Sequence, residues 1–140
     1  MEDESNHLYF KTKSGKAKKR RVITTGLNGH AIEWNLMTST PSAKLNLHSA
    51  IWDSKMHGKY LYAAQEDGSI KVIKVKKTKL ELVRSLVKMD SRCLSLELER
   101  EVDEKSIVKS LFGGYADSSI RKWDLTTGNS VLHFEKGKKS

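Results

Sequence analysis

The sequence predicts an all-β fold built from about three repeats of four short antiparallel strands. Small turns that tolerate positive φ recur between apolar runs, at Asn28-Gly29, Asp67-Gly68 and Asp117-Ser118. The first residues of these turns are 39 and then 50 residues apart, which indicates an internal repeat of about 40 residues. The runs beside each turn are rich in β-branched and aromatic residues, and no segment has the apolar period of a helix.

The first unit surrounds the first of these turns. The runs RRVITTGL (20–27) and AIEWNLM (31–37) are predicted to form its central hairpin, and SAKLNLH (42–48) a further strand. The single proline, Pro41, is expected to lie in the loop before that strand. No clear strand precedes the hairpin, so we expect the first strand of this unit to be missing or degenerate.

The second and third units each contain four predicted strands. The second comprises SAIWDSKM (49–56), KYLYAAQ (59–65), SIKVIKV (69–75) and LELVRSL (80–86). The third comprises SRCLSLEL (91–98), VKSLFGGY (108–115), SIRKWDL (119–125) and SVLHFEK (130–136). The third unit is longer because it contains the polar stretch LEREVDEKSIVK (98–109), which is predicted to be an inserted loop.

The units also share a position in the third strand. Six residues after the first turn residue stand Trp34, Ile73 and Trp123, followed by Asn35, Lys74 and Asp124. Together with the Asp-Gly turn and the four strands per unit, this pattern resembles the blades of WD40 proteins. The resemblance implies a WD40-type β-propeller fragment of about three four-stranded antiparallel blades. Its structural blade positions are Trp34, Asp67, Gly68, Ile73, Asp117, Trp123 and Asp124.

The resemblance also implies a domain organisation. Residues 1–21 are expected to form a flexible charged N-terminal segment, residues 22–136 a partial propeller, and residues 137–140 a basic tail. The blades are expected at about 22–46, 47–86 and 87–136. Three blades cannot close a ring, because propellers have about 4 to 8. We therefore expect apolar outer faces that the rest of a longer propeller covers, or failing that another chain.

A narrower resemblance concerns the order of the units. The series TGLNGHAIEWNL, AIWDSKMHGKYLYAAQEDGSIKV, DSRCLSLEL and GGYADSSIRKWDLTTGNSV is similar to successive blades in the N-terminal propeller of the cirhin family. That family has Asp and Gly where this chain has Asn35 and Ser118, and it has two propellers. The resemblance implies a nucleolar scaffold in the t-UTP subcomplex of the small-subunit processome. By the same resemblance, the scaffold is expected to support processing of pre-rRNA and transcription of rDNA. Its expected partners are other processome proteins.

Basic residues exceed acidic ones by 26 to 17, which favours an anionic partner, nucleic acid or an acidic protein surface ahead of membrane. The run Lys16, Lys18, Lys19, Arg20 and Arg21 has three interpretations: a solvated arm, a nuclear import signal, or contact with RNA phosphates. A second cluster comprises Lys71, Lys74, Lys76, Lys77 and Lys79. It is expected either to protect a sheet edge or to bind RNA or an acidic partner.

The tryptophans are expected to pack between blades. This applies to Trp34, Trp52 and Trp123, which lie on predicted strands. In WD40 blades such a tryptophan often joins a buried network, which here would contain Asp117, Ser110 and Trp123.

No arrangement of residues indicates catalysis, a metal site or a cofactor. The five histidines lack metal-ligand spacing, and one cysteine, Cys93, excludes an internal disulfide. Cys93 lies in an alternating apolar strand and is expected to be a buried, unreactive thiol. The N-terminus has no signal-peptide run, and no stretch is apolar enough to span a bilayer.

Two other functions remain open beside the scaffold. One is a substrate adaptor of a cullin-type ubiquitin ligase, although the Trp-Asp-x-Arg of such adaptors is absent at Trp123-Asp124-Leu125-Thr126. The other is a free-standing RNA-binding protein, which would bind RNA with a steep salt dependence.

Overall fold

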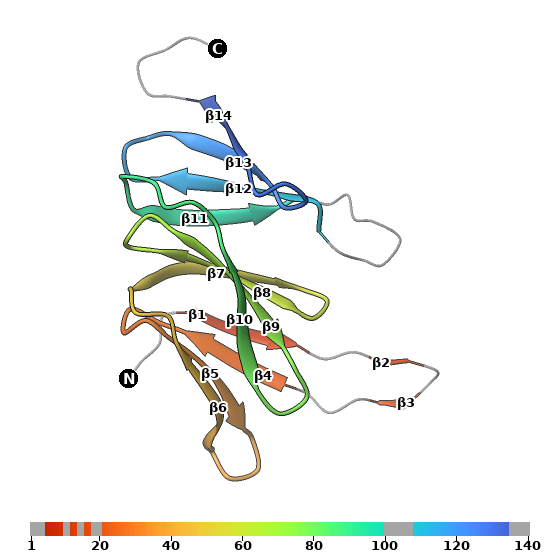
Figure 1. Cartoon of the computed structure of the whole chain (residues 1–140). Helices are drawn as coiled ribbons and strands as arrows, with labels where there is room; N and C mark the ends of the chain where they lie inside the picture. The colour runs from red at the N-terminus through yellow and green to blue at the C-terminus, as the bar shows by residue number, and fades with distance from the viewer. Residues whose placement is uncertain (1–4, 10–11, 14–15, 18–20, 100–107, 135–140) are drawn as a thin grey trace.

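Three four-stranded antiparallel sheets follow one another along the chain in the computed structural model of the protein (Figure 1). The structure describes residues 5–9, 12–13, 16–17, 21–99 and 108–134. The strand orders are β1-β4-β5-β6 in the first sheet, β10-β9-β8-β7 in the second and β11-β12-β13-β14 in the third, and β2 and β3 form a separate hairpin. No helix occurs in the described ranges, so the predicted all-β fold of about three four-stranded units is confirmed.

The strands of the first sheet are β1 Ser5–Tyr9, β4 Arg21–Thr25, β5 His30–Asn35 and β6 Thr40–Asn46, with β2 Thr12–Lys13 and β3 Lys16–Ala17 between β1 and β4. Those of the second are β7 Ile51–His57, β8 Tyr60–Gln65, β9 Ile70–Val75 and β10 Leu80–Ser85. Those of the third are β11 Cys93–Leu98, β12 Ser110–Tyr115, β13 Ile120–Asp124 and β14 Ser130–Phe134.

The first sheet has a complete first strand, so the expectation that this strand is missing was wrong. β1 pairs antiparallel with β4, from Ser5 opposite Thr25 to Tyr9 opposite Arg21. These five residues lie inside the segment 1–21 that the sequence places outside the blades. The strand SNHLY contains no β-branched residue and stands before a charged stretch, so local pattern does not reveal it. Its partner residues lie 12 to 20 residues away in the sequence, which only the assembled sheet shows.

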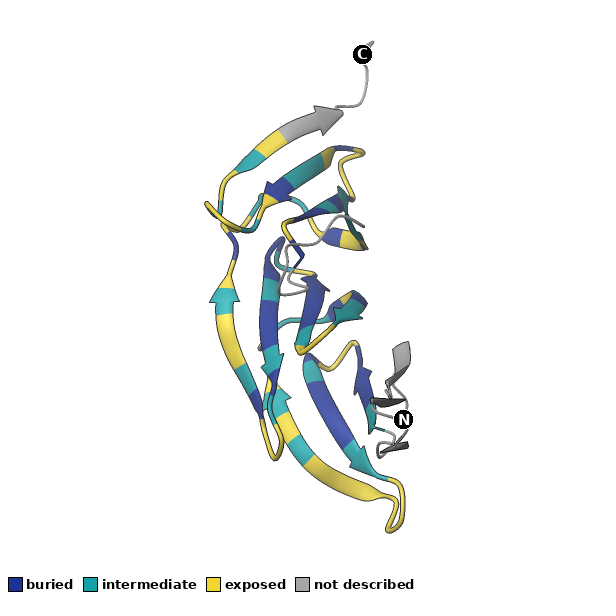
Figure 2. Cartoon of the chain, turned by 90° about the vertical axis from the view of Figure 1, so that its right-hand side faces the viewer, coloured by how far each residue is buried: buried dark blue, intermediate teal, exposed yellow. Residues whose placement is uncertain are grey.

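The second sheet lies between the other two and is buried on both faces. Leu61, Ala63 and Ile73 pack in a cluster with Ile23 of the first sheet. On the opposite face, other residues of the second sheet pack in a cluster with the third sheet; from β8 and β9 these are Tyr62, Ala64, Ile70 and Val72. Burial on both faces explains why these strands read as nearly continuous apolar runs. Exposed residues concentrate instead on the outer strands β6 and β10 (Figure 2).

Polar contacts also join neighbouring sheets. The hydroxyls of Thr25 and Ser54 lie 2.9 Å apart between the first and second sheets, and both side chains are buried. The backbone N–H of Leu96 donates to Asp53 Oδ2 at 2.9 Å between the second and third sheets. These bonds satisfy polar groups that stacking would otherwise leave buried without partners, and they set the register of one sheet on the next.

The face of the third sheet that points away from the second is partly apolar. Val131 on β14 pairs with Lys122 on β13, and Lys122 in turn pairs with Phe112 on β12. Val131 is 68% exposed and Ile120 is also exposed, while Lys122 lies over the ring of Phe112 at 5.6 Å from its centroid. Exposed apolar side chains are therefore present on this face, as the three-blade count predicts.

Three buried groups predict a loss of stability at alkaline pH. Burial raises the pKa of Cys93 to about 12 from 9.0 and the pKa of Tyr62 to about 12 from 10.0, and it raises the pKa of Tyr115 as well. The folded protein thus keeps protons that the unfolded chain releases. The stabilisation is complete below about pH 9 and decreases as the pH rises toward about 12. Urea unfolding at pH 7 to 11 should show this decrease.

The control for the alkaline series is Cys93→Ala. Because the unfolded tyrosines begin to ionise about one pH unit above the cysteine, the decrease in this variant should start correspondingly later. A free energy of unfolding that stays constant up to pH 11 in the unsubstituted chain would contradict the assignment.

Candidate interaction surfaces

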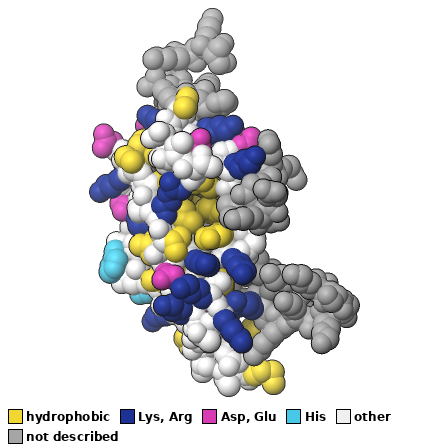
Figure 3. All heavy atoms as spheres, turned by 45° about the vertical axis from the view of Figure 1, so that its right-hand side comes forward, with side chains coloured by type: hydrophobic (Ala, Val, Ile, Leu, Met, Phe, Trp, Pro, Cys, Tyr) yellow, Lys and Arg dark blue, Asp and Glu magenta, His cyan; other side chains and the backbone are white. Residues whose placement is uncertain are grey.

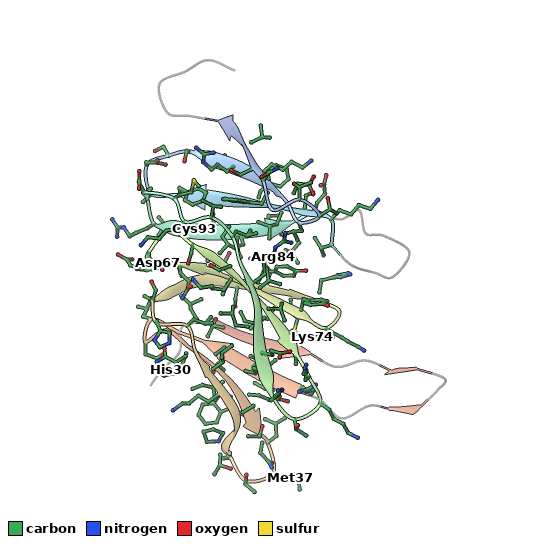
Figure 4. All side chains as sticks on the ribbon, viewed as in Figure 1. His30, Met37, Asp67, Lys74, Arg84 and Cys93 are labelled. Carbon is green, nitrogen blue, oxygen red and sulfur yellow. The ribbon has the colours of Figure 1, made fainter. Side chains whose placement is uncertain are left out.

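The hairpin turns of the sheets lie at two opposite ends of the molecule. Figure 4 shows Asp67, in the turn between β8 and β9, on one side and Lys74, at the far end of β9, on the other. We call the first side the turn end and the second the basic end. The two ends differ in chemistry, so we describe them separately.

At the turn end, the three repeated turns are closed by their own side chains. Asp67 Oδ1 accepts hydrogen bonds from Ser69 N at 3.0 Å and from Ser69 Oγ at 2.6 Å. Asp117 Oδ1 accepts the equivalent bonds from Ser119 at 2.9 and 2.6 Å, and Asn28 Oδ1 accepts one from His30 N at 3.0 Å. Such Asx turns support the tight chain reversal locally.

The same bonds lower the pKa of both aspartates. For Asp67, desolvation raises the pKa, but the hydrogen bonds from Ser69 and the charge of Lys71 outweigh it. For Asp117, the hydrogen bonds from Ser119 are the main cause. Both carboxylates are occupied within their turns, which favours the structural role predicted for them over ligand binding.

Each of these turns is also tied to the linker that precedes its sheet. Asp67 N donates to Ser49 Oγ at 3.0 Å, and Asp117 N donates to Ser91 Oγ at 2.9 Å. The sequence analysis missed the role of these serines. The available signal was their spacing, since Ser49 and Ser91 occupy the same place before the first strand of two successive units.

The repeated third-strand positions are buried to different degrees. Trp123 is 1% exposed and donates from Nε1 to the hydroxyl of Tyr115 at 3.0 Å. Ile73 is fully buried. Trp34 is half-buried and donates to Thr24 Oγ1 at 2.9 Å. The packing role expected of Trp123 therefore fits its position.

The expected buried network of Asp117, Ser110 and Trp123 does not form. Trp123 bonds to Tyr115, Asp117 bonds to Ser119, and the hydroxyl of Ser110 donates to Glu99. Ser110 begins β12, Asp117 lies in the β12–β13 turn and Trp123 lies near the end of β13. Each of the three therefore bonds to another residue. Asp124 likewise turns back to Thr126, whose N and Oγ1 donate to its Oδ1 at 2.8 and 2.6 Å, and this lowers the pKa of Asp124.

Trp52 does not pack between sheets, so that expectation was wrong. The register shifts between Ile51 and Asp53, and Trp52 at this bulge is 42% exposed. Its Nε1 donates to Glu66 Oε1 at 2.6 Å. A bulge turns a side chain out of the alternation that the sequence pattern assumes.

At the basic end, the structure brings Arg21, the last residue of the first basic run, to the β9–β10 turn, which is far away in the sequence. The Arg21 guanidinium donates to both carboxylate oxygens of Glu33 at 2.6 Å, and its Nη2 also donates to the backbone oxygen of Lys76 at 2.8 Å. The hydrogen bond to Glu33 is the main cause that raises the pKa of Arg21. Arg21 thus joins the end of the first basic run to the β9–β10 turn.

The other predicted basic residues differ in availability. Lys76 pairs with Glu81 at 2.8 Å, whereas Lys77 is exposed and Lys74 is half-buried. Lys16 lies in β3, and the predicted contacts Lys18, Lys19 and Arg20 lie outside the described residues.

Edge protection does not account for the lysines of β9. This strand pairs with β8 on one side and β10 on the other, so Lys71 and Lys74 lie on an interior strand. Lys71 donates to Ser69 Oγ at 2.6 Å. The sequence identified the lysines, but it did not show that strands pair with β9 on both sides, which left protection of a sheet edge as one interpretation.

Removal of the Arg21 guanidinium tests the ion pair between Arg21 on β4 and Glu33 on β5 of the first sheet. Arg21→Gln should lower the free energy of unfolding by about 1–2 kcal/mol, because the Glu33 side chain is only 12% exposed and loses a bidentate partner. Urea unfolding of Arg21→Gln, Glu33→Gln and the double variant gives the coupling energy. If the two single effects simply add, the pair contributes no coupling and the assignment is wrong.

The described residues also include side chains of the types that bind metal ions, and the thiol of Cys93. In this described part of the chain, the His, Cys, Asp and Glu side chains form no group of three or more that is placed to hold a metal ion. Cys93 is fully buried and donates from Sγ toward the carbonyl of Ser95 at 3.7 Å. Among the residues described, none belongs to a helix long and apolar enough to cross a membrane.

The chain resembles one curated protein in sequence. U3 small nucleolar RNA-associated protein 4 of Schizosaccharomyces pombe is 31% identical over 117 residues, which are 80% of this chain and 16% of that protein. The chain therefore spans about one sixth of the length of this relative. No protein-family model matches the chain.

Solved structures agree with the predicted fold. The structure titled "Crystal structure of RRP9 WD40 repeats" matches 84% of this chain with a TM-score of 0.67 at 12% identity, over 36% of its own length. The structure titled "Structure of U3-55K" matches the same share with the same score and identity, over 37% of its length. At this identity the likeness shows the fold alone, and it confirms the predicted WD40-type β-propeller architecture.

Proposed function

Since the chain is a WD40-repeat protein of the U3 small nucleolar RNA-associated (UTP) type, we propose that it acts as a non-catalytic scaffold in ribosome biogenesis. The observation that supports this most is the 31% identity over 117 residues to U3 small nucleolar RNA-associated protein 4. The scaffold works in the small-subunit processome, as part of its t-UTP subcomplex, in the nucleolus. There it supports processing of pre-rRNA to small-subunit rRNA and transcription of rDNA.

The geometry suits a scaffold better than an enzyme. The two aspartates of the repeated turns are bonded within their own turns, Asp67 with Ser69 and Asp117 with Ser119, which supports a structural role for them. Two exposed surfaces can bind other macromolecules. One contains Ile120 and Val131 on the third sheet, and the other contains the lysines of the basic end. Such surfaces hold other macromolecules in place.

The partly apolar face of the third sheet is the surface on which the next blade of the propeller packs. A further blade, from the same gene product or from another chain, covers Ile120 and Val131 in the assembled protein. Substitution of exposed Val131 by glutamate on this face would then impair assembly while the three described sheets stay folded. The polar pair Lys122–Glu99, at 3.4 Å, lies on the same face and offers a partner for polar groups of that blade.

Affinity purification of the tagged full-length gene product tests the scaffold role. Small-subunit processome proteins and pre-rRNA should be recovered, and the proteins should persist after RNase treatment because protein contacts hold them. A tagged, unrelated WD40 protein provides the control for non-specific binding. Recovery of cullin components in place of processome proteins would reject the scaffold in favour of a ligase adaptor.

A further inference from the structure

We propose that the basic end binds the phosphate backbone of RNA through Lys59, Lys74, Lys77 and Lys79. The inference rests on the proposed function in one respect, since pre-ribosomal RNA is the polyanion that a processome scaffold meets. The four lysines come from two turns and the end of a strand, and the sequence does not place Lys59 with the others. Figure 3 shows Lys and Arg side chains gathered over the lower half of one face, which is where this end lies.

Backbone hydrogen bonds hold the two turns in one surface. Val75 N donates to the carbonyl of Lys59 at 2.7 Å, which joins the β9–β10 turn to the β7–β8 turn. Lys76 N donates to the carbonyl of Lys79 at 2.9 Å, which closes the β9–β10 turn. Lys74 lies opposite Tyr60, the residue next to Lys59. The positive charges are therefore held at a set spacing by the fold.

Two carboxylates at this end, those of Glu33 and Glu81, are paired with basic side chains. Glu33 is bound by Arg21, and Glu81 is bound by Lys76. The hydrogen bond from Lys76 is the main cause of a lowered pKa of Glu81, and the charges of Lys79 and Lys74 lower it further. A second carboxylate close by would raise the pKa of Glu81 and so oppose the lysines. Because the lysines favour the charged form of Glu81, the electrostatic potential at this end also favours binding of an anion.

The composition of the surface favours RNA over an acidic protein. Lysine is depleted where proteins contact one another, and those interfaces need an apolar centre. The apolar residues that directly flank the β9–β10 turn, Val75 and Leu80, are buried. Exposed Leu82 and Val83 lie further along β10, so the turn itself offers no such centre. Base stacking would need exposed aromatic rings, but Tyr60 is half-buried and packs against the core. Contact between lysine side chains and RNA phosphates is the remaining way to bind RNA, and such contact does not depend on the nucleotide sequence.

The test measures binding of the 140-residue chain to a fluorescein-labelled RNA hairpin by anisotropy at several salt concentrations. The variant Lys77→Gln/Lys79→Gln changes two exposed turn residues. It should weaken binding about tenfold and reduce the slope of log K against log salt by about 1.5 to 2. The matched control Lys44→Gln/Lys88→Gln removes the same charge from exposed sites away from this end. It should leave the slope nearly unchanged.

Each other outcome overturns the inference. An equal loss in both variants means diffuse attraction by net charge. Binding of a poly-glutamate probe that matches the RNA and is equally weakened by Lys77→Gln/Lys79→Gln means a protein partner. Lys77→Arg/Lys79→Arg should restore binding, and failure to do so while circular dichroism stays unchanged also contradicts phosphate contact. If RNA binding fails while processome proteins are still recovered with the full-length product, the scaffold stands and only this surface assignment falls.

Discussion

Trp123→Ala is expected to lower the free energy of unfolding by about 3–5 kcal/mol, the range for a fully buried large aromatic residue. Trp123 is 1% exposed and belongs to the cluster that joins the second and third sheets. The substitution leaves a cavity between the sheets and removes the donor to the Tyr115 hydroxyl. A single domain of this size has a total stability of about 5–15 kcal/mol, so the effect is a large share of it.

The control is Trp123→Phe, which keeps most of the apolar volume and removes the indole N–H. It should cost about 1–2 kcal/mol, mainly because the buried hydroxyl of Tyr115 loses its partner. Urea unfolding, followed by circular dichroism, measures both variants. An alanine variant within 1 kcal/mol of the unsubstituted chain would mean that the third sheet does not pack through Trp123.

Gly68→Ala is expected to cost about 3 kcal/mol or more. Gly68 has φ +88°, which an L side chain rarely adopts. An added Cβ would lie 2.1 Å from the carbonyl oxygen of Met89 and 2.8 Å from that of Ser91. Both neighbours are backbone atoms, and Met89 N also donates to the carbonyl of Gly68 at 3.0 Å. Relief of the clash therefore requires the turn and the linker to separate.

The equivalent turn of the third sheet provides a matched comparison. Ser118 stands where the second sheet has Gly68 and already adopts φ +73° with a side chain. Ser118→Gly should raise the free energy of unfolding by up to about 1 kcal/mol, because removal of the left-handed strain outweighs the greater entropy that glycine gives the unfolded chain. Thermal or urea unfolding of both variants gives the comparison. If Gly68→Ala and Ser118→Gly shift stability in the same direction, backbone conformation does not control these turns.

Strands β4 to β14 were predictable because their signals are local. Asp67-Gly68 and Asp117-Ser118 lie between apolar runs, and the structure places hairpins at both. Burial of Cys93 followed from strand alternation, and burial of Trp123 followed from its repeated position in the third strand of the unit. The roles of Asp67 and Gly68 as structural positions stay predictions that the geometry supports.

Local pattern failed where a residue's environment comes from distant parts of the chain. Trp52 lies on a predicted strand, but a bulge turns it outward to Glu66. β1 was missed because its partner β4 follows a hairpin and a basic run. Lys59 was not grouped with Lys77, because only a backbone bond between two turns brings their segments together.

The sequence by itself determined that this protein forms repeated antiparallel hairpins, since turn residues and alternating β-branched residues act over a few positions. Only the tertiary structure decided which surfaces remain for binding. The contacts of Arg21 with Glu33 and with Lys76, 12 and 55 residues away, place Arg21 beside the lysines of the β9–β10 turn. Such pairings depend on how the sheets stack, and stacking is a property of the whole chain that no local pattern contains.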